Sequence, residues 1–281
     1  MSTYAAPLSL SLRWPVRPGL LLAWLFLTVL IVAAVAPKWL TGIDPLDATA
    51  RLAYLPPGST HWLGTDENGR DVLARLIHGT RPSLLMGLVS TAIGLVAGIV
   101  LGLVAGLGPR WVDGALMRAV DVLLAFPDLL LALVIITFWG QGLWITIFAV
   151  GVASIPRFAR MVRAQTRVVR DAPYVEAATT LGHRRAAVIV RHVLPNAIKP
   201  ILILATIGIG HNIITGAALS FLGFGASPPA PEWGSMLAMG RNFLANAWWL
   251  VAWPSVVIIL TVVSITAIGR DWLQRSEGKT R

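Results

Sequence analysis

The chain has 281 residues, of which 56% are hydrophobic and only 13% charged, and its mean hydropathy is +0.73. Soluble domains are less apolar and about one-quarter charged, so the composition excludes an ordinary soluble protein. The sequence contains no cysteine, which excludes disulfides and thiolate metal sites, and arginines in cytoplasmic loops explain the net charge of +10 better than nucleic-acid binding does.

Residues 1–81 are predicted to hold a cytoplasmic tail, a first spanning helix and an extracytoplasmic loop. The run 18–37 is uncharged and has the roughly 20 residues that a helix needs to cross a bilayer. Ala34-Val35-Ala36 imitates a signal-peptidase site, so a cleaved signal is the alternative to an uncleaved helix. The pattern of residues 72–77 predicts a short amphipathic helix, either at the membrane surface or on an ordinary surface, with Arg75 on its polar side.

Five further spans are predicted within a core at 82–272, followed by a cytoplasmic tail at 273–281. The expected spans and connections are 82–109, 113–137, 143–156, a polar hairpin at 171–196, 200–224, a loop at 225–247, and 248–268. The second span carries glycines at four-residue spacing, which lets helices approach closely in lipid. These glycines are Gly94, Gly98, Gly102 and Gly106, with Gly87 further towards the start of the span. Pro127 is expected to kink the third span.

Four polar residues inside the spans are candidates for a translocation path: Asp121, Asp128, His211 and Asn212. Asp121 lies three residues after Arg118, a spacing that predicts an ion pair. An intramembrane carboxylate such as Asp128 is a functional candidate, although an arginine partner or a watery cavity would make it structural. His211 and Asn212 fit a helix–helix hydrogen bond better than a ligand site.

The segment 171–196 is polar and basic, and its pattern predicts two short helices joined by a turn. We expect Asp171 to cap the first helix, Gly182 to end it and Pro195 to end the second, which starts near His183. The fourth span is expected to continue as one helix that ends at this segment and carries five arginines at spacings of three and four residues: Arg157, Arg160, Arg163, Arg167 and Arg170. A hairpin with this charge cannot lie in hydrocarbon, so it projects into water or into another protein.

The distribution of basic residues predicts the orientation. Six spans place both termini on one side of the membrane. All but six of the 23 Lys and Arg residues fall on the side of the termini and the hairpin. The six exceptions are Lys38, Arg51, Arg70, Arg75, Arg81 and Arg241. By the positive-inside rule the termini and the hairpin are cytoplasmic.

The sequence indicates no enzyme. It contains no GxxxxGK[ST] phosphate loop, no HExxH helix and no GxSxG elbow, and its five histidines have no recognisable metal spacing. A polar hairpin beside a six-helix bundle predicts instead a docking surface for a soluble partner.

The hairpin resembles a known signature. Glu176-Ala177-Ala178, Gly182, Ile189 and Leu194-Pro195-Asn196 resemble the EAA motif of bacterial ABC-importer permeases. Stretches at 61–84, 117–133 and 219–237 resemble the dipeptide, oligopeptide and nickel branch of that family, in particular its second permease with a GTDxxGRD segment. This resemblance runs from about residue 61 to 272. It implies an all-α type I ABC-importer permease fold, with six transmembrane helices and a cytoplasmic coupling hairpin.

The resemblance also implies roles and partners. The ATPase-coupling residues would be Glu176, Ala177, Ala178, Gly182, Ile189, Leu194 and Pro195. The assembly would contain a second homologous permease, two cytoplasmic ATP-binding subunits and an extracytoplasmic solute-binding protein in the bacterial inner membrane. This chain would bind no cofactor or metal, because ATP and Mg are used by the ATPase subunits. The cargo would be a peptide, or nickel or a metal chelate.

Departures from the branch leave alternatives open. Gly216 stands where members often have glutamate, the chain ends its last span with GRDWL at 269–273, and Asp128, His211 and Asn212 are not expected. A peptide exporter of the same family is one alternative. An ion-coupled secondary carrier that uses Asp128 is another, and a purely structural membrane anchor is the third.

Overall fold

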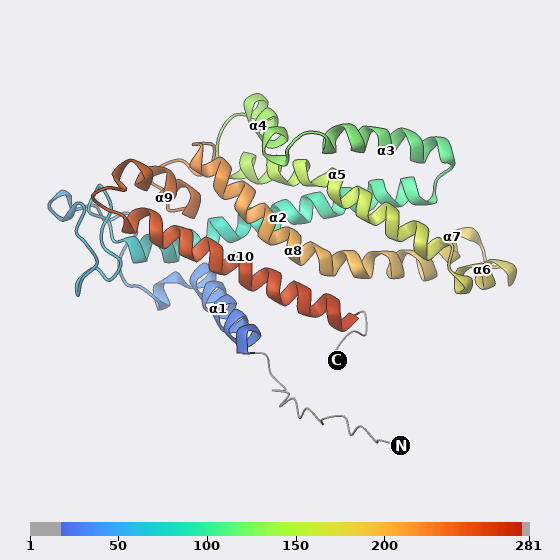
Figure 1. The fold of residues 1–281 in the computed structure, drawn as a ribbon, viewed down its shortest axis with the longest axis horizontal. Coiled ribbons are helices and arrows are strands. Elements are labelled where there is room, and N and C mark those ends of the chain that lie inside the picture. The colour runs from blue at the N-terminus through green and yellow to red at the C-terminus, as the bar shows by residue number, and fades with distance from the viewer. Residues whose placement is uncertain (1–17, 277–281) are drawn as a thin grey trace, which may run out of the picture.

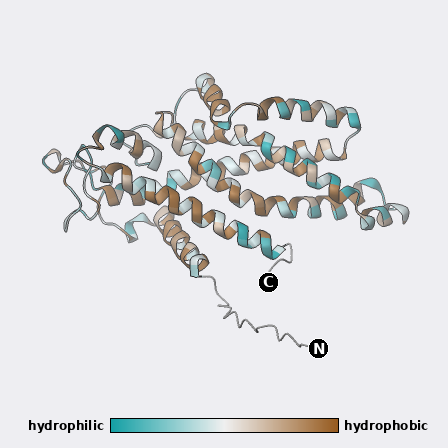
Figure 2. Ribbon diagram, viewed as in Figure 1, coloured by the Kyte–Doolittle hydropathy of each residue, from teal (hydrophilic) through white to brown (hydrophobic). Residues whose placement is uncertain are grey.

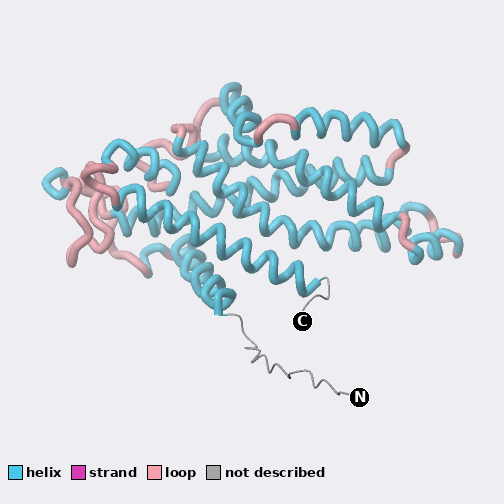
Figure 3. Tube along the Cα trace, in the orientation of Figure 1, coloured by secondary structure: helices cyan, strands magenta, loops and turns pink. Residues whose placement is uncertain are grey.

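The computed structural model describes residues 18–276, where the chain consists of helices joined by loops (Figures 1 and 3). The α-helices of this range are α1 (Pro18–Val35), α2 (Val72–Leu107), α3 (Arg110–Leu124), α4 (Asp128–Trp139), α5 (Leu143–Arg170), α6 (Pro173–Thr180), α7 (Arg185–Val188), α8 (Leu194–Phe221), α9 (Trp233–Gly240) and α10 (Trp249–Ser276). Short 3-10 helices lie at Pro37–Trp39, Ala50–Leu52 and Arg241–Phe243, and a π-helical turn at Ile189–Val193. The terminal segments 1–17 and 277–281, with most of the predicted tails, lie outside the described residues.

Within residues 18–276, five helices are long and apolar enough to cross a bilayer: α1, α2, α5, the helical stretch Arg185–Phe221 that ends in α8, and α10. Apolar residues dominate them (Figure 2), and large side chains such as Leu22, Val96 and Ile259 are exposed on their outer surfaces. α5 continues through Pro156 along the five arginines, as predicted, whereas α8 extends beyond the predicted span because Pro200 lies inside a continuous helix rather than at its start. Neighbouring helices and local adjustments accommodate such prolines in membrane helices. The division of the chain at residues 81 and 272 stays a prediction.

Glycines hold α2 against α5. A Cβ built at Gly94, Gly98, Gly102 or Gly106 would come within 3 Å of α5. The side chains it would meet belong, in the same order, to Ser154, Phe158, Val162 and Thr166. This result confirms the predicted glycine packing face. Because both series rise together by four residues, α2 and α5 run parallel to each other.

The third predicted span is broken rather than kinked. α3 and α4 meet at an angle of 92° across residues 125–127, and Pro127 is the residue before α4. Proline disfavours helical geometry in the residue before it, which explains why the helix stops there. α3 follows the end of α2 closely, while α4 leads to the start of α5 (Figure 1). Since α5 runs parallel to α2, the bent pair must return the chain to the opposite end, and it therefore counts as one span.

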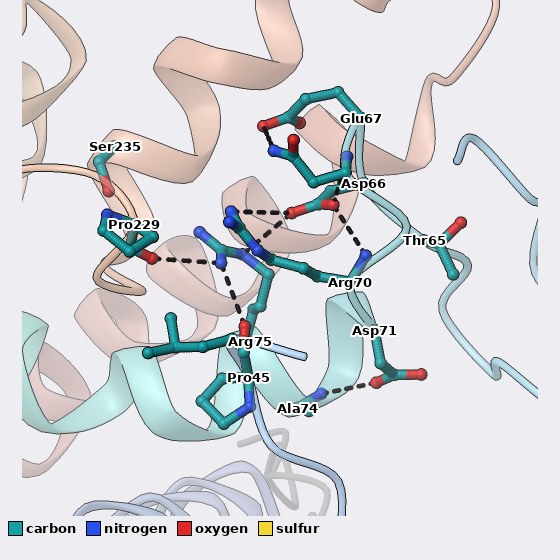
Figure 4. A network of polar contacts seen from close by, with 12 residues as sticks. Pro45, Thr65, Asp66, Glu67, Arg70, Asp71, Ala74, Arg75, Pro229 and Ser235 are labelled. Atoms are coloured by element: carbon teal, nitrogen blue, oxygen red, sulfur yellow. Dashed lines mark hydrogen bonds and ion pairs between the residues drawn. The ribbon is translucent and has the colours of Figure 1, made fainter. Parts of the chain in front are cut away.

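The amphipathic helix expected at 72–77 is the beginning of α2, not a separate surface helix. Arg75 was expected on a polar face, but its side chain is only 1% exposed. Its Nε lies 3.4 Å from Asp66 Oδ2, and its Nη1 donates to the carbonyl oxygens of Pro45 and Pro229 at 3.2 and 3.3 Å (Figure 4). One buried guanidinium thus joins α2 to two loops that are distant in sequence.

The predicted loop at 225–247 contains α9. Glu232 begins α9 by accepting hydrogen bonds from the backbone N–H groups of Gly234 and Ser235, both at 2.8 Å. Ser83 Oγ of α2 donates to the same carboxylate at 3.2 Å. Burial of the Glu232 side chain raises its pKa above the ordinary value. The pattern of Pro and Gly that indicated a loop did not reveal this buried cap.

Candidate functional site: a basic hairpin and a line of ion pairs

The hairpin is formed by α6, a glycine turn, α7 and the start of α8, at one end of the bundle (Figure 1). Gly182 has a φ of +80°, a left-handed conformation that glycine adopts without the steric cost other residues face, and it ends α6 as predicted. The residue before α6 is Ala172, not Asp171. Asp171 instead ends α5 and pairs with Arg170.

The second hairpin helix does not end at Pro195. α7 begins at Arg185 and passes through the π-helical turn directly into α8. Proline lacks the N–H that an internal helical position donates, but Pro195 falls in the first turn of α8, where no such donor is needed. At this junction the N–H of Leu194 bonds to the carbonyl of Ile189, five residues back. The wider turn therefore lets the chain continue through the proline.

The residues expected to couple lie on different faces of the hairpin. Glu176, Ala177, Gly182 and Pro195 are exposed, and Ile189 and Leu194 are half-buried. Ala178 is 7% exposed and packs with other small aliphatic residues in a core beneath the hairpin. The first half of the signature therefore places Glu176 and Ala177 outward and Ala178 inward.

One arginine of the hairpin and one at the end of α5 bind the last carbonyl groups of α2. Arg185 Nη2 donates to the carbonyl of Leu107 at 3.2 Å, and Arg170 Nη1 donates to that of Gly106 at 2.9 Å. The last carbonyls of a helix lack partners within the helix, and cations are stabilising near them. The hairpin is thereby held in place by the same helix that packs along α5.

The arginines of α5 pair with aspartates of the bent span. Arg163 donates two hydrogen bonds of 2.7 Å to Asp113, and Arg167 also forms an ion pair with Asp113. Arg160 pairs with Asp121. The expected pair between Arg118 and Asp121 is therefore wrong, because Asp121 faces α5 rather than its own helix.

Asp128 has two partners in the same line. Arg157 Nη1 lies 3.6 Å from Asp128 Oδ2, and His211 Nε2 lies 3.0 Å from the same oxygen. Arg157 also donates to Asn212 Oδ1 at 3.3 Å, and Asn212 Nδ2 donates to the hydroxyl of Thr91 at 3.0 Å. These five side chains come from four helices (α2, α4, α5 and α8), which joins His211 and Asn212 to a helix–helix network.

This network lies near the middle of the membrane. Residues 82–107 of α2 carry no charge and span about 39 Å as a helix. Arg157 precedes Phe158, which packs on Gly98, close to the middle of that run. Nevertheless 47% of the His211 side chain and 29% of the Asp128 side chain are exposed. Polar groups at this depth do not face lipid, so this surface faces water or another subunit.

Sequence reasoning missed Thr91, Arg157 and Arg160 as partners of the intramembrane polar residues. The sequence did contain a signal for these pairs. Asp113, Asp121 and Asp128 recur at intervals of about two helical turns, and the arginines recur along α5. Among residues 18–276, no group of three or more His, Cys, Asp or Glu side chains is arranged to hold a metal ion.

The chain is similar to known transport proteins. The family described as binding-protein-dependent transport system inner membrane component matches residues 98–278. The di/tripeptide transport permease DppC of Pseudomonas aeruginosa (strain UCBPP-PA14) is 39% identical over 89% of this chain and 85% of its own length. The glutathione transport permease GsiD of Pectobacterium atrosepticum is 41% identical, over 86% and 82%.

The fold has solved counterparts. An inward-facing structure of the MetNI methionine ABC transporter contains a chain that superimposes with a TM-score of 0.61 at 21% identity, covering 72% of this chain and 95% of that one. A chain of an amino acid ABC transporter reaches 0.59 at 18% identity, over 72% and 94%. These matches confirm the ABC-importer permease fold, and the chain belongs to the family of inner membrane components of binding-protein-dependent transport systems.

Proposed function

We propose that this chain is a permease subunit of an ATP-driven importer for peptides or peptide-like solutes such as glutathione. The two relatives described above are named as permeases for di/tripeptides and for glutathione, and their similarity extends over most of the chain. Nickel, which the sequence resemblance also allowed, is not the cargo named for either relative. The assembly would comprise a second homologous permease, two cytoplasmic ATP-binding subunits and an extracytoplasmic solute-binding protein.

The hairpin carries this proposal. Its outward face presents Glu176 and Ala177, whereas Val175 and Ala178 seal its inner side. The excess of arginine near it supports a cytoplasmic location for the hairpin and both termini, in the bacterial inner membrane. ATP and Mg would act in the partner ATPases, and this chain would be non-catalytic. Movement of the ATPases would pull on the hairpin, and its ties to the end of α2 would transmit that pull to the spans.

Replacement of Gly182 by tryptophan tests the coupling assignment, and Gly140→Trp is the matched control. Both glycines have a positive φ, +80° and +91°, and nothing lies closer than 4.0 Å to a Cβ at either position. Gly140 also has a ψ of −171°, a region that essentially only glycine adopts, so tryptophan costs the backbone at least as much at Gly140 as at Gly182. We expect Gly182→Trp to abolish binding-protein-dependent uptake of a labelled dipeptide at a normal membrane level, while Gly140→Trp transports normally.

Normal uptake by Gly182→Trp would refute the assignment. The same assay separates the rivals. An exporter would give no uptake that depends on the binding protein. An ion-coupled carrier would lose uptake when the ion gradient is collapsed with ATP retained, whereas the proposed importer would keep it.

We also propose that Asp121, Asp128, His211 and Asn212 belong to the side of the subunit that borders the translocation path. The partly exposed His211 and Asp128 at mid-membrane depth support this, since a path between two permeases would supply their water. Because Arg157 is its ion-pair partner, Asp128 would have a structural role beside the path. Asn212, only 1% exposed, would act behind the surface by holding Arg157.

Because the chain has no cysteine, single-cysteine variants can test the path directly. We expect His211→Cys in the assembled transporter to react with a water-soluble thiol reagent, at a rate that changes when ATP is added. Ile259→Cys is the control, since Ile259 is 59% exposed on an apolar surface of α10 and should face lipid. Equal, slow labelling at both positions would contradict the path assignment.

A further inference from the structure

A cavity of about 330 Å³ lies between the hairpin and the ends of α2 and α5. That volume is at the lower end of the range for small-molecule sites. Part of the lining is aliphatic and includes Val188 and Val193. The rest, called the basic side below, is polar and basic, with Thr179, Arg170, His183 and Arg185. The coupling role proposed above does not require this combination.

The basic side keeps unused hydrogen-bond donors. Arg185 uses one nitrogen for the carbonyl of Leu107, whereas Arg170 uses Nη1 for the carbonyl of Gly106 and Nε for Asp171. Each guanidinium has five N–H donors in a planar fork, so several remain for a ligand. Asp171 pairs with Arg170 and offsets its charge. Among residues 18–276 Arg185 has no acidic partner, and no Asp or Glu of that range lines the cavity. The uncompensated positive charge at the cavity is therefore that of Arg185.

The cavity lies at the depth of lipid head groups. The uncharged run of α2 is about 39 Å long and ends at Leu107, which lines the cavity. If this run is centred on a hydrocarbon core of about 30 Å, each of its ends extends about 4–5 Å beyond the core, so Leu107 lies within the polar head-group layer. Trp111, 76% exposed in the first turn of α3, is a residue typical of that interface.

We propose that this cavity binds the phosphate group of an anionic phospholipid from the cytoplasmic leaflet. Arg185 and Arg170 donate to the phosphate, and the glycerol and upper acyl carbons lie against Val188 and Val193. Basic pockets of cytoplasmic membrane faces favour such head groups. This inference rests on the cytoplasmic orientation proposed above. A bound lipid bridges the hairpin and the end of α2, so coupling depends on the lipid composition of the membrane.

Wild-type protein gives the first test. The complete transporter, with its ATPase and partner permease subunits, is incorporated in bilayer nanodiscs of phosphatidylcholine with or without phosphatidylglycerol. We expect native mass spectrometry to show retained phosphatidylglycerol, and a higher unfolding temperature when that lipid is present. Inorganic phosphate and glycerol 3-phosphate are added in parallel. If they stabilise the complex as well as the lipid does, a free phosphate compound is the ligand and the lipid assignment is overturned.

Two variants locate the site, Arg185→Gln and Arg170→Gln. Each should retain about fivefold less phosphatidylglycerol, the loss expected for one basic residue near an anionic head group. Arg191→Gln removes an exposed arginine of the same hairpin that does not line the cavity, and it should retain lipid as wild type does. Equal retention by all variants would overturn the proposal.

The ATPase subunits retained by each preparation are measured at the same time. If both arginine variants lose ATPase but keep lipid, the basic side is an ATPase contact and not a lipid site. If wild-type protein never retains an ATPase, the proposed function fails, whereas loss of lipid binding alone refutes only this inference.

Discussion

Asp113 pairs with both Arg163 and Arg167. Its replacement tests how much the ion pairs between α5 and the bent span contribute to stability. Its side chain is 9% exposed, while those of Arg163 and Arg167 are 27% and 40% exposed. Asp113→Asn leaves both guanidiniums without a charged partner, so we expect the free energy of unfolding to fall by roughly 2 kcal/mol, less than for a fully buried pair. Denaturant titration of the purified transporter measures this.

Asp171→Asn is the control for that measurement. Asp171 pairs with Arg170, but its side chain is 68% exposed, so its loss should cost less than about 1 kcal/mol. Equal losses of unfolding free energy from the two substitutions would mean that burial does not determine how much these ion pairs contribute to stability.

At the same scale, sequence reasoning identified the polar residues better than their partners. Asp121, Asp128, His211 and Asn212 were recognisable because polar groups are rare in apolar runs. Local spacing suggested the wrong partner for Asp121, because partners on other helices depend on how helices pack. Arg75 was placed on a polar face for a similar reason: the periodicity of one helix cannot reveal loops that cover it from elsewhere.

At the scale of the helices, alanine is expected to destabilise the protein at a glycine packed between α2 and α5 and to stabilise it at an unpacked glycine of α3. A Cβ at Gly98 would lie 2.4 Å from Phe158 Cβ, whereas a Cβ at Gly114 in α3 meets nothing within 4 Å. Gly98→Ala should therefore lower the free energy of unfolding by about 1–3 kcal/mol through overpacking. Gly114→Ala should raise it by up to about 1 kcal/mol, because alanine favours the helix. Thermal unfolding of both variants decides, and stabilisation by Gly98→Ala would contradict the close approach.

The glycine spacing predicted this contact because close approach in lipid depends on small side chains. The same level of reasoning misjudged prolines, since a proline marks a break only when nothing accommodates it. Pro127 breaks the helix between α3 and α4 rather than kinking it, and Pro200, expected before the start of a span, lies within α8. At Pro195 the π-helical turn before it preserves continuity, a feature with no signature in the hydrophobic pattern.

For the whole molecule, the number and order of the spans were predictable from the lengths of uncharged runs. The sequence could not predict whether α3 and α4 cross the membrane or return to the same side, because hydropathy does not distinguish a broken span from a re-entrant loop. The parallel contacts of α2 and α5 resolve this point, and they place the turn at 140–142 at the same end as the loop before α2. The backbone contact from Gly142 N–H to the carbonyl of Phe224, at 3.3 Å, ties that turn to the far end of α8 from the hairpin.

Single-cysteine labelling tests this architecture in intact cells. Gln141→Cys and Trp62→Cys should both react with a membrane-impermeant maleimide added outside, because both positions lie at the end opposite the hairpin. Arg184→Cys, an exposed hairpin position, should react only after the cells are opened. Protection of position 141 with labelling of position 62 would mean that α3 and α4 re-enter the same side. Outside labelling of position 184 would reverse the orientation, and the proposed contact with cytoplasmic ATPases would fail with it.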